Sequence, residues 1–499
     1  MDKPGRVYIV GAGPGDRDLI TLKGRRVLGQ ADVVLFDHLA NEALLDLAPA
    51  AAERIYVGKK RSEHAASQEE ICAMLIDRAR RGLTVVRLKG GDPYIFGRGG
   101  EEAEALADAG IPFEVVPGVT SALGIAAYAG VPLTHRDHTS VVSFVTGHDV
   151  PRIDWDKVGA SETLVVFMGL THLRDIAREI TARGRSPETP AMAVRWATRP
   201  DQQIIVGTLA DLADCVERAG MKPPATVVIG EVVRLREKLN WFERLPLFGT
   251  RIAITRAPSQ AQELRGRLES LGAEVVELPV ISIQPPADPA PLDRAIANLA
   301  DYDWLIFTSA NGVRFFLDRL DRSARDLRSL RARICAIGPA TRRAVEELHL
   351  KVDLMPAEYV AEALVAAFAQ HNLAGKRVLL PRAAVARDVI PAELARLGAK
   401  IDVVEAYRNV PLPDAASRVH AILEGPHKPH WITFTSSSTV TNFIEIAGRD
   451  ALAGIRTASI GPVTSATLRA HGIEPAVEAR EFTIDGLVAA ILQNNVPVS

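Results

Sequence analysis

The chain of 499 residues has only three cysteines, few aromatic residues and almost no net charge. Cys72, Cys215 and Cys335 lie far apart and form no C-x-x-C spacing, which argues against a disulfide framework and a typical zinc site, so we expect no metal. A formal net charge of -2 provides no global basic field and argues against nucleic acid as a partner. No apolar run approaches the roughly 18 residues of a membrane span. The opening MDKPGRVYIVG has no signal-peptide core. We therefore expect a cytoplasmic protein with no membrane partner.

Short β-prone runs alternate with longer Ala-, Leu-, Arg- and Glu-rich stretches almost throughout the chain. This alternation predicts an α/β fold with largely parallel sheets. The predicted strands include RVYIVG, ADVVLFD, TVVRLKGGD, FEVVPG, SVVSFVTG, TLVVFMG and TVVIGEVV. The length favours several domains. A charged, proline-containing seam at 235–256 places the main boundary at about residue 248, which predicts domains 1–247 and 248–499.

The second half of the chain repeats itself in four landmarks that recur in the same order at nearly one spacing. They are ITR (254–256) with LPR (380–382), LGA (271–273) with LGA (397–399), FTS (307–309) with FTS (434–436), and IGP-x-T (337–341) with IGP-x-T (460–464). This predicts an internal duplication, hence two similar α/β domains with a cleft between them, where ligands often bind. The β-prone segments 275–285 and 401–411 are candidates for strands that cross between these domains. The residues alone leave open whether each repeat folds on itself or exchanges its first half.

Three glycine-containing loops of the first half follow predicted strands. GAGPGD (11–16) departs from the dinucleotide pattern G-x-G-x-x-G, and Pro14 stiffens the turn and removes an N–H donor. Dinucleotide binding stays an alternative, because Asp37 ends the second strand. RLKGGDPYIFGRGGEE (87–102) suits a loop that holds a nucleoside, with Asp92 accepting from a hydroxyl or amine, or simply a long turn before a helix. In VVPGVTSA (115–122), Thr120 and Ser121 suit either helix capping or a ligand carboxylate.

These strings, together with LTHR, TGHD and VVFMGL, resemble the uroporphyrinogen-III C-methyltransferases of the tetrapyrrole methylase family over residues 5 to about 245. The resemblance implies two α/β domains, a homodimer formed by this half, and S-adenosylmethionine as methyl donor. The implied cofactor contacts are Pro14, Gly90, Gly91, Asp92, Ile95, Thr120, Ser121, Met168 and Ala225. Ala197 stands where relatives often have glycine, so a backbone contact there survives only if its φ is negative.

Methylation of a pyrrole carbon leaves a cation that must lose a proton, so positioning and a base are needed. By resemblance, Asp37 is the base and Lys59 a proton donor or carboxylate anchor. The plain alternatives are a helix cap for Asp37 and a solvated edge for Lys59. Arg98, His135 and Arg136 would pair with the acidic side chains of the tetrapyrrole substrate.

Residues 250–499 resemble uroporphyrinogen-III synthase through strings such as DWLIFTSANGV, VVEAYRN and WITFTSSSTVTNF. The resemblance implies two α/β domains joined by a two-stranded connector, one from 250–282 with 409–499 and the other from 285–406. It assigns Tyr407 to assist departure of the substrate hydroxyl. The implied contacts with substrate are Arg256, Ser309, Thr341, Ser436, Ser437 and Thr464. Helix capping is the alternative for each single hydroxyl residue.

The two resemblances agree, because the product of the second half is the substrate of the first. Together they predict an enzyme that cyclises hydroxymethylbilane to uroporphyrinogen III and methylates it twice to precorrin-2, for sirohaem or cobalamin. The alternatives are another tetrapyrrole-family methylase fused to a non-catalytic ligand-binding module and, less favoured, an NAD-dependent oxidoreductase.

Overall fold

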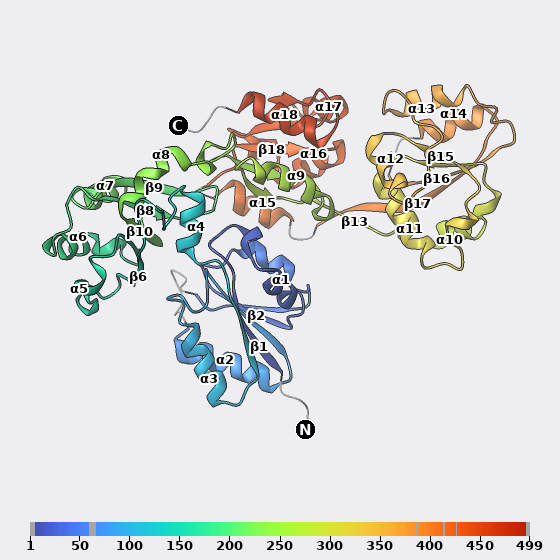
Figure 1. Ribbon diagram of the computed structural model, residues 1–499. Coiled ribbons are helices and arrows are strands. Elements are labelled where there is room, and N and C mark those ends of the chain that lie inside the picture. Colours follow the sequence, from blue (N-terminus) through green and yellow to red (C-terminus); the bar gives the residue numbers. More distant parts are fainter. Residues whose placement is uncertain (1–4, 59–65, 386–387, 413–414, 426, 496–499) are drawn as a thin grey trace. The chain divides into compact units, whose positions relative to one another are not determined.

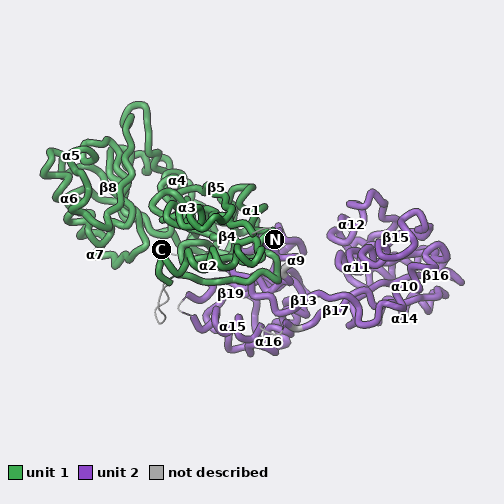
Figure 2. The backbone as a smooth tube through the Cα atoms, turned by 90° about the horizontal axis from the view of Figure 1, so that it is seen from below, with its two compact units in different colours: residues 1–251, 266–275, 492–499 green, residues 252–265, 276–491 purple. Residues whose placement is uncertain are grey.

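The computed structural model describes residues 5–58, 66–385, 388–412, 415–425 and 427–495, which form four five-stranded sheets flanked by helices (Figure 1). The chain divides into two compact units, 1–251 with 266–275 and 492–499, and 252–265 with 276–491 (Figure 2). The predicted α/β fold class is confirmed, whereas the boundary at residue 248 stays a prediction. Among the described residues, no helix combines the length and apolar character needed to cross a bilayer.

The first sheet of unit 1 is parallel throughout, with strand order β3-β2-β4-β1-β5. Its strands are β1 (Arg6–Gly11), β2 (Val33–Phe36), β3 (Glu53–Tyr56), β4 (Thr84–Lys89) and β5 (Phe113–Val116). Apolar side chains of α1 (Leu22–Leu28) pack on one face, and those of α2 (Gln68–Arg80) and α3 (Gly99–Asp108) pack on the other. Because β4, β1 and β5 are neighbours, the loops after their carboxyl ends meet at one edge of the sheet.

The second sheet of unit 1 corrects the prediction of largely parallel sheets. Its order is β6-β7-β10-β8-β9, and only β6 and β7 run parallel, whereas β10 is antiparallel to β7 and β8, and β8 to β9. Residues 196–202 join β8 to β9, and this connection is too short for the crossover helix that a parallel pair needs. The strands are β6 (Val142–Thr146), β7 (Thr163–Phe167), β8 (Pro190–Arg195), β9 (Gln203–Thr208) and β10 (Ala225–Ile229).

Helices cover both faces of this second sheet. Buried residues of α4 (Ser121–Tyr128) pack on one face, and those of α6 (Leu173–Ala182) and α7 (Leu212–Arg218) pack on the other. Two short helices complete the part before residue 248, α5 (Trp155–Val158) and α8 (Arg236–Leu239). Helix α4 directly follows the loop after β5, so it links the first sheet to the second.

The remaining two sheets show the predicted duplication. Their orders are β12-β11-β18-β19-β20 and β13-β17-β16-β14-β15, so β12, β11, β18 and β19 occupy the same relative positions as β17, β16, β14 and β15. The strands are β11 (Arg251–Ile254), β12 (Glu274–Glu277), β13 (Ile281–Gln284), β14 (Trp304–Phe307), β15 (Arg333–Ala336), β16 (Arg377–Ala383), β17 (Lys400–Pro411), β18 (Trp431–Phe434), β19 (Arg456–Ser459) and β20 (Val477–Glu478). The helices are α9 (Pro258–Ser270), α10 (Ala290–Ala297), α11 (Ala310–Leu320), α12 (Pro339–Glu346), α13 (Ala361–Phe368), α14 (Val389–Arg396), α15 (Ala415–Leu423), α16 (Ser437–Ala447), α17 (Pro462–Ala470) and α18 (Ile484–Asn494).

The two crossing strands expected in 275–285 and 401–411 are present. Strand β13 pairs antiparallel with the last residues of β17, in the register Ile281 to Pro411 and Gln284 to Arg408 (Figure 1). Strands β11, β18 and β19 are mutually parallel, as are β17, β16, β14 and β15. The two-stranded connector of the predicted fold is therefore confirmed.

Candidate active sites

The three glycine-containing loops of unit 1 lie in backbone contact with one another. Gly13 and Gly91 exchange two hydrogen bonds, at 3.2 Å and 2.8 Å. A Cβ atom on Gly118 would lie 2.3 Å from the carbonyl oxygen of Gly91, and one on Gly11 would lie 2.5 Å from the Cα of Gly118. Such distances are sterically forbidden, so glycine is required where these loops cross. The loops after β1, β4 and β5 thus form one continuous backbone surface.

Asp92 fixes the geometry of this surface. Its carboxylate accepts the backbone N–H of Tyr94 at 2.8 Å and that of Gly118 at 3.0 Å. The side chain therefore joins the loop after β4 to the loop after β5. Each oxygen of the Asp92 carboxylate keeps a lone pair that these two N–H groups do not occupy, and a ligand hydroxyl or amine would donate to it.

The loop after β1 is also held by α4 and by the turn between β8 and β9. A Cβ atom on Gly124 would meet Pro14 at 2.7 Å, so the proline packs directly on α4. The N–H of Asp16 donates to Thr198 Oγ1 at 2.8 Å, and Tyr128 donates its hydroxyl to Asp16 at 2.6 Å. Burial, followed by the hydrogen bond to Asp16, raises the pKa of Tyr128, which keeps it protonated as a donor.

Backbone strain is concentrated around the same loops. Among the described residues, six non-glycine residues have positive φ, and five of them are Phe96 (53°), Arg98 (58°), Met168 (54°), Trp196 (53°) and Thr198 (69°). Such strained residues gather at functional sites more often than elsewhere. Ala197 lies between two of them, yet its own φ is not positive. The alanine therefore fits this backbone without strain, as a preserved backbone contact requires.

The other cofactor positions predicted from the sequence differ in their surroundings. Thr120 is buried at the start of α4 but makes no capping hydrogen bond, and Ser121 is half-buried beside it. Ile95 and Met168 are apolar but remain 38% and 51% exposed. Gly90 stands next to Leu39, whose Cβ would lie 2.4 Å from an added methyl group.

Ala225 differs from these positions, because its side chain belongs to the buried cluster that also contains Val227 and Ile229. The helix α4 and Phe167 pack in a separate cluster on the other face of the sheet. Only the backbone of Ala225 is therefore available to the loops.

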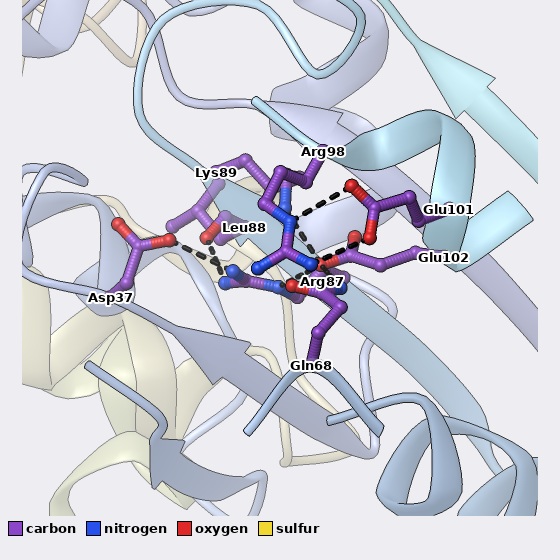
Figure 3. A network of polar contacts seen from close by, with 8 residues as sticks. All are labelled: Asp37, Gln68, Arg87, Leu88, Lys89, Arg98, Glu101 and Glu102. Carbon is purple, nitrogen blue, oxygen red and sulfur yellow. Dashed lines mark hydrogen bonds and ion pairs between the residues drawn. The ribbon is translucent and has the colours of Figure 1, made fainter. Parts of the chain in front are cut away.

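The carboxylate of Asp37 follows β2 and is anchored at both oxygens. One oxygen accepts the N–H of Leu39 at 3.0 Å. The other accepts from Arg87 Nη2 at 2.9 Å (Figure 3). Arg87 continues into a buried network with Glu102 and Lys89, three residues that the sequence analysis did not single out for this role. The signal was available in RLKGG, since charged residues two positions apart share one face of a buried strand. Lys59 lies outside the described residues.

The predicted substrate contacts of this half are more exposed. Arg98 pairs with Glu101 at 2.6 Å on the surface of α3. His135 accepts the N–H of Asp137 at 3.2 Å and packs its ring against His138, while Arg136 is exposed. Within the described part of the chain, no hydrogen bond joins His135 or Arg136 to the glycine loops. No group of three His, Cys, Asp or Glu side chains suited to a metal is found in that part either.

The second candidate site lies at Tyr407 on β17. Its hydroxyl is 3.0 Å from Ser309 Oγ, and its ring stacks on Phe315 with centroids 5.8 Å apart. Ser309 also accepts the N–H of Gly312 and so caps α11. The hydroxyl of Ser309 therefore both caps α11 and contacts Tyr407.

The duplicated counterpart of Ser309 is Ser436, which caps α16 with nearly the same backbone angles. Ser437 begins that helix and donates to the carbonyl of Val463 at 3.3 Å. Thr341 and Thr464 are both buried within the first turns of α12 and α17. The structure thus places all five predicted hydroxyl residues after the carboxyl ends of parallel strands, at the N-termini of four helices that favour anions.

Arg256 follows β11 and donates through Nε to Gln260 at 3.1 Å. Gln260 donates in turn to Asn311 of α11 at 2.5 Å. Burial lowers the pKa of Arg256, and the negative charge of Glu263 opposes this shift only in part. A desolvated guanidinium whose hydrogen-bond partner, Gln260, is neutral is suited to receive a ligand carboxylate.

Comparison with known proteins gives matches to both halves. Family models match at residues 6–213, described as Tetrapyrrole (Corrin/Porphyrin) Methylases, and at 262–489, described as Uroporphyrinogen-III synthase HemD. The chain is 36% identical over 498 residues to the porphyrin biosynthesis protein HemD of Ruminiclostridium josui, and the match covers 98% of each chain. It is 53% identical over 247 residues to the siroheme synthase of Pseudomonas entomophila, with 49% of this chain covered, and it spans about half (53%) of that protein's length.

A solved structure also matches the first half. It is the uroporphyrin-III C-methyl transferase of Thermus thermophilus complexed with S-adenyl homocysteine. The two are 45% identical, and the match covers 46% of this chain and 100% of that one with a TM-score of 0.41.

Proposed function

Since the chain belongs to the family that joins a tetrapyrrole methylase domain to a uroporphyrinogen-III synthase domain, and is thus a bifunctional enzyme of tetrapyrrole biosynthesis, we propose that it catalyses two consecutive reactions. It closes hydroxymethylbilane to uroporphyrinogen III with loss of water. It then methylates that product twice from S-adenosylmethionine to give precorrin-2. The full-length match to a porphyrin biosynthesis protein is the observation that carries this proposal.

The glycine loops of unit 1 suit the methyl donor. Where these loops cross, only glycine leaves room, so backbone N–H and C=O groups are available to a nucleoside beside the Asp92 carboxylate. Ile95 and Met168 provide exposed apolar side chains, and the Thr120 hydroxyl makes no capping hydrogen bond to α4. When bound, S-adenosylmethionine supplies an electrophilic methyl group. Asp37 accepts the proton that the methylated ring system loses, and Lys59 donates a proton or holds a carboxylate.

The synthase half acts by binding the carboxylates of the substrate and by assisting the departure of the substrate hydroxyl. Pyrrole nitrogen lone pairs expel the substrate hydroxyl, and Tyr407 donates a hydrogen bond to that group as it leaves as water. Arg256, Thr341, Ser437 and Thr464 bind carboxylates while the linear chain folds back for ring closure. Neither step requires a metal among these residues.

The test is to incubate the purified full chain with hydroxymethylbilane, with and without S-adenosylmethionine, and to identify the products. Type III porphyrin without the methyl donor and a dimethylated product with it support both activities. Recovery of the spontaneous type I isomer alone would refute the synthase activity, and would favour a methylase fused to a ligand-binding module. Asp37→Asn tests the base, and wild-type methylation by that variant would refute its role. Sedimentation of the full chain tests the homodimer that the methylase half implies.

A further inference from the structure

Four charged side chains form a chain of contacts that leads from the interior of unit 1 to Asp37 (Figure 3). Glu102 Oε1 accepts from Lys89 Nζ at 2.7 Å and from Arg87 Nε at 3.2 Å. Gln68 Nε2 donates to the same oxygen at 3.2 Å. Arg87 then reaches Asp37 at 2.9 Å. The chain of contacts therefore joins α2, α3 and β4 to the end of β2.

All three guanidinium nitrogens of Arg87 have a hydrogen-bond partner. Nε binds Glu102, Nη1 binds the carbonyl of Leu88 at 3.0 Å, and Nη2 binds Asp37. Because the guanidinium is planar and rigid, the first two contacts fix the direction of the third. The carboxylate of Glu102 thus determines where the Arg87 donor meets Asp37.

The side chains of this network become more exposed from Glu102 towards Asp37. The side chain of Glu102 is 0% exposed and those of Arg87 and Lys89 are 5% exposed, whereas that of Asp37 is 24% exposed. The second oxygen of Glu102 is buried without a hydrogen-bond partner in the structure. Asp37 is therefore the one member of the four that is open to a ligand.

Stability alone does not account for this arrangement. Buried ion networks can often be replaced by apolar side chains at no loss of stability, because the cost of desolvation offsets the attraction between the charges. An unpartnered buried carboxylate oxygen adds a further cost. The two buried cations, Arg87 and Lys89, nevertheless balance the negative charges of Glu102 and Asp37, so the four side chains have no net charge.

We propose that Glu102 is a positioning residue of the methylation reaction, which acts through Arg87 to orient the Asp37 carboxylate, while Lys89 completes the balance of charge around it. The proposal rests on the role of Asp37 as base. Besides Arg87 and Lys89 on β4, the groups that interact with Asp37 include Tyr56 on β3, whose pKa is raised by its own burial and then by the carboxylate. His38 follows directly in the sequence and meets Trp196 edge to face.

The test compares Glu102→Gln and Lys89→Met in the full chain, by the pH dependence of kcat/KM for methylation of uroporphyrinogen III. Removing the anion leaves excess positive charge, so the acid limb should move to lower pH by roughly half to one unit and the plateau should fall about tenfold. Removing the cation should move the limb the opposite way. The double variant restores the charge balance and should return the limb close to that of the wild type.

A merely structural role would lower the unfolding temperature without opposite displacements of the acid limb. Binding of S-adenosylmethionine and the synthase activity of the same chain check that each variant is folded. If both single variants keep the wild-type limb while Asp37→Asn is inactive, the positioning role is overturned and the base assignment stands. If Asp37→Asn methylates at the wild-type rate, the base assignment is overturned and the positioning role with it.

Discussion

The hydroxyl of Tyr407 lies 3.0 Å from the hydroxyl of Ser309, which caps helix α11 through the N–H of Gly312. Because Ser309 accepts from Gly312, its own proton is free to be donated to Tyr407. The tyrosine proton is then available to a leaving hydroxyl of the substrate. The contact thus orients the proposed donor and leaves its proton unused.

Tyr407→Phe should lower kcat for ring closure by about 10- to 100-fold, because the ring still stacks on Phe315 and only the donor is lost. The measurement is the rate of uroporphyrinogen III formation from hydroxymethylbilane. Methylation of supplied uroporphyrinogen III by the same variant is the control and should not change. Ser309→Ala should lower kcat less, while it lowers the free energy of unfolding by about 1 kcal/mol through loss of the cap. Equal rates for Tyr407→Phe and the wild type would contradict the role of Tyr407.

Gly118→Ala should abolish binding of S-adenosylmethionine, because the added Cβ would lie 2.3 Å from the carbonyl oxygen of Gly91 and would push the loops apart. Calorimetric titration measures the affinity, and a loss of at least about 100-fold is expected, or about 2.7 kcal/mol. Gly100→Ala is the matched control, since nothing lies within 4 Å of a Cβ there. That variant should bind normally and gain roughly 0.5–1 kcal/mol of helix stability. Normal binding by Gly118→Ala would show that the loop crossing is not part of the cofactor site.

Much of the fold followed from local patterns. Each of the seven quoted runs of the first half contains a strand, although the last, 226–233, continues into the 3-10 helix Glu231–Leu235. The duplication and the crossing segments 275–285 and 401–411 are confirmed, as is the resemblance to the two families. The antiparallel pairing of β8 with β9 was not predicted, because strand propensity does not encode the direction of a strand. The short connection 196–202 is the feature that indicates this direction. The spacing of Arg87 and Lys89 indicated one shared face, but the partner Glu102 comes from another element. Such pairings depend on tertiary packing, which periodicity along one strand does not encode.

Cys335 should be the least reactive of the three thiols. It is buried in β15, and burial raises its pKa to about 12, so almost no thiolate forms at neutral pH. Iodoacetamide labelling followed by mass spectrometry should modify Cys72 and Cys215, which are half-buried, well before Cys335. A raised thiol pKa in the folded state also contributes stability that is complete below the unfolded value and is lost as the pH rises through about 12. Equal labelling of all three cysteines at pH 8 in the folded protein would contradict this burial.

Arg256→Gln should raise KM for hydroxymethylbilane more than it lowers kcat, because the guanidinium binds substrate and does not take part in bond breaking. Burial lowers the pKa of Arg256, and its partner Gln260 is neutral, so a substrate carboxylate would regain the electrostatic energy that desolvation removes. We expect KM to rise about tenfold, which corresponds to about 1.4 kcal/mol. The matched control is Arg449→Gln, which removes an exposed arginine that contacts Asp450 and should leave KM unchanged. The dependence of KM on salt distinguishes the two variants further, since an ion pair with substrate weakens as ionic strength rises. A KM for Arg256→Gln that matches the wild type at low and high salt would remove this arginine from the substrate site and leave it a structural role with Gln260.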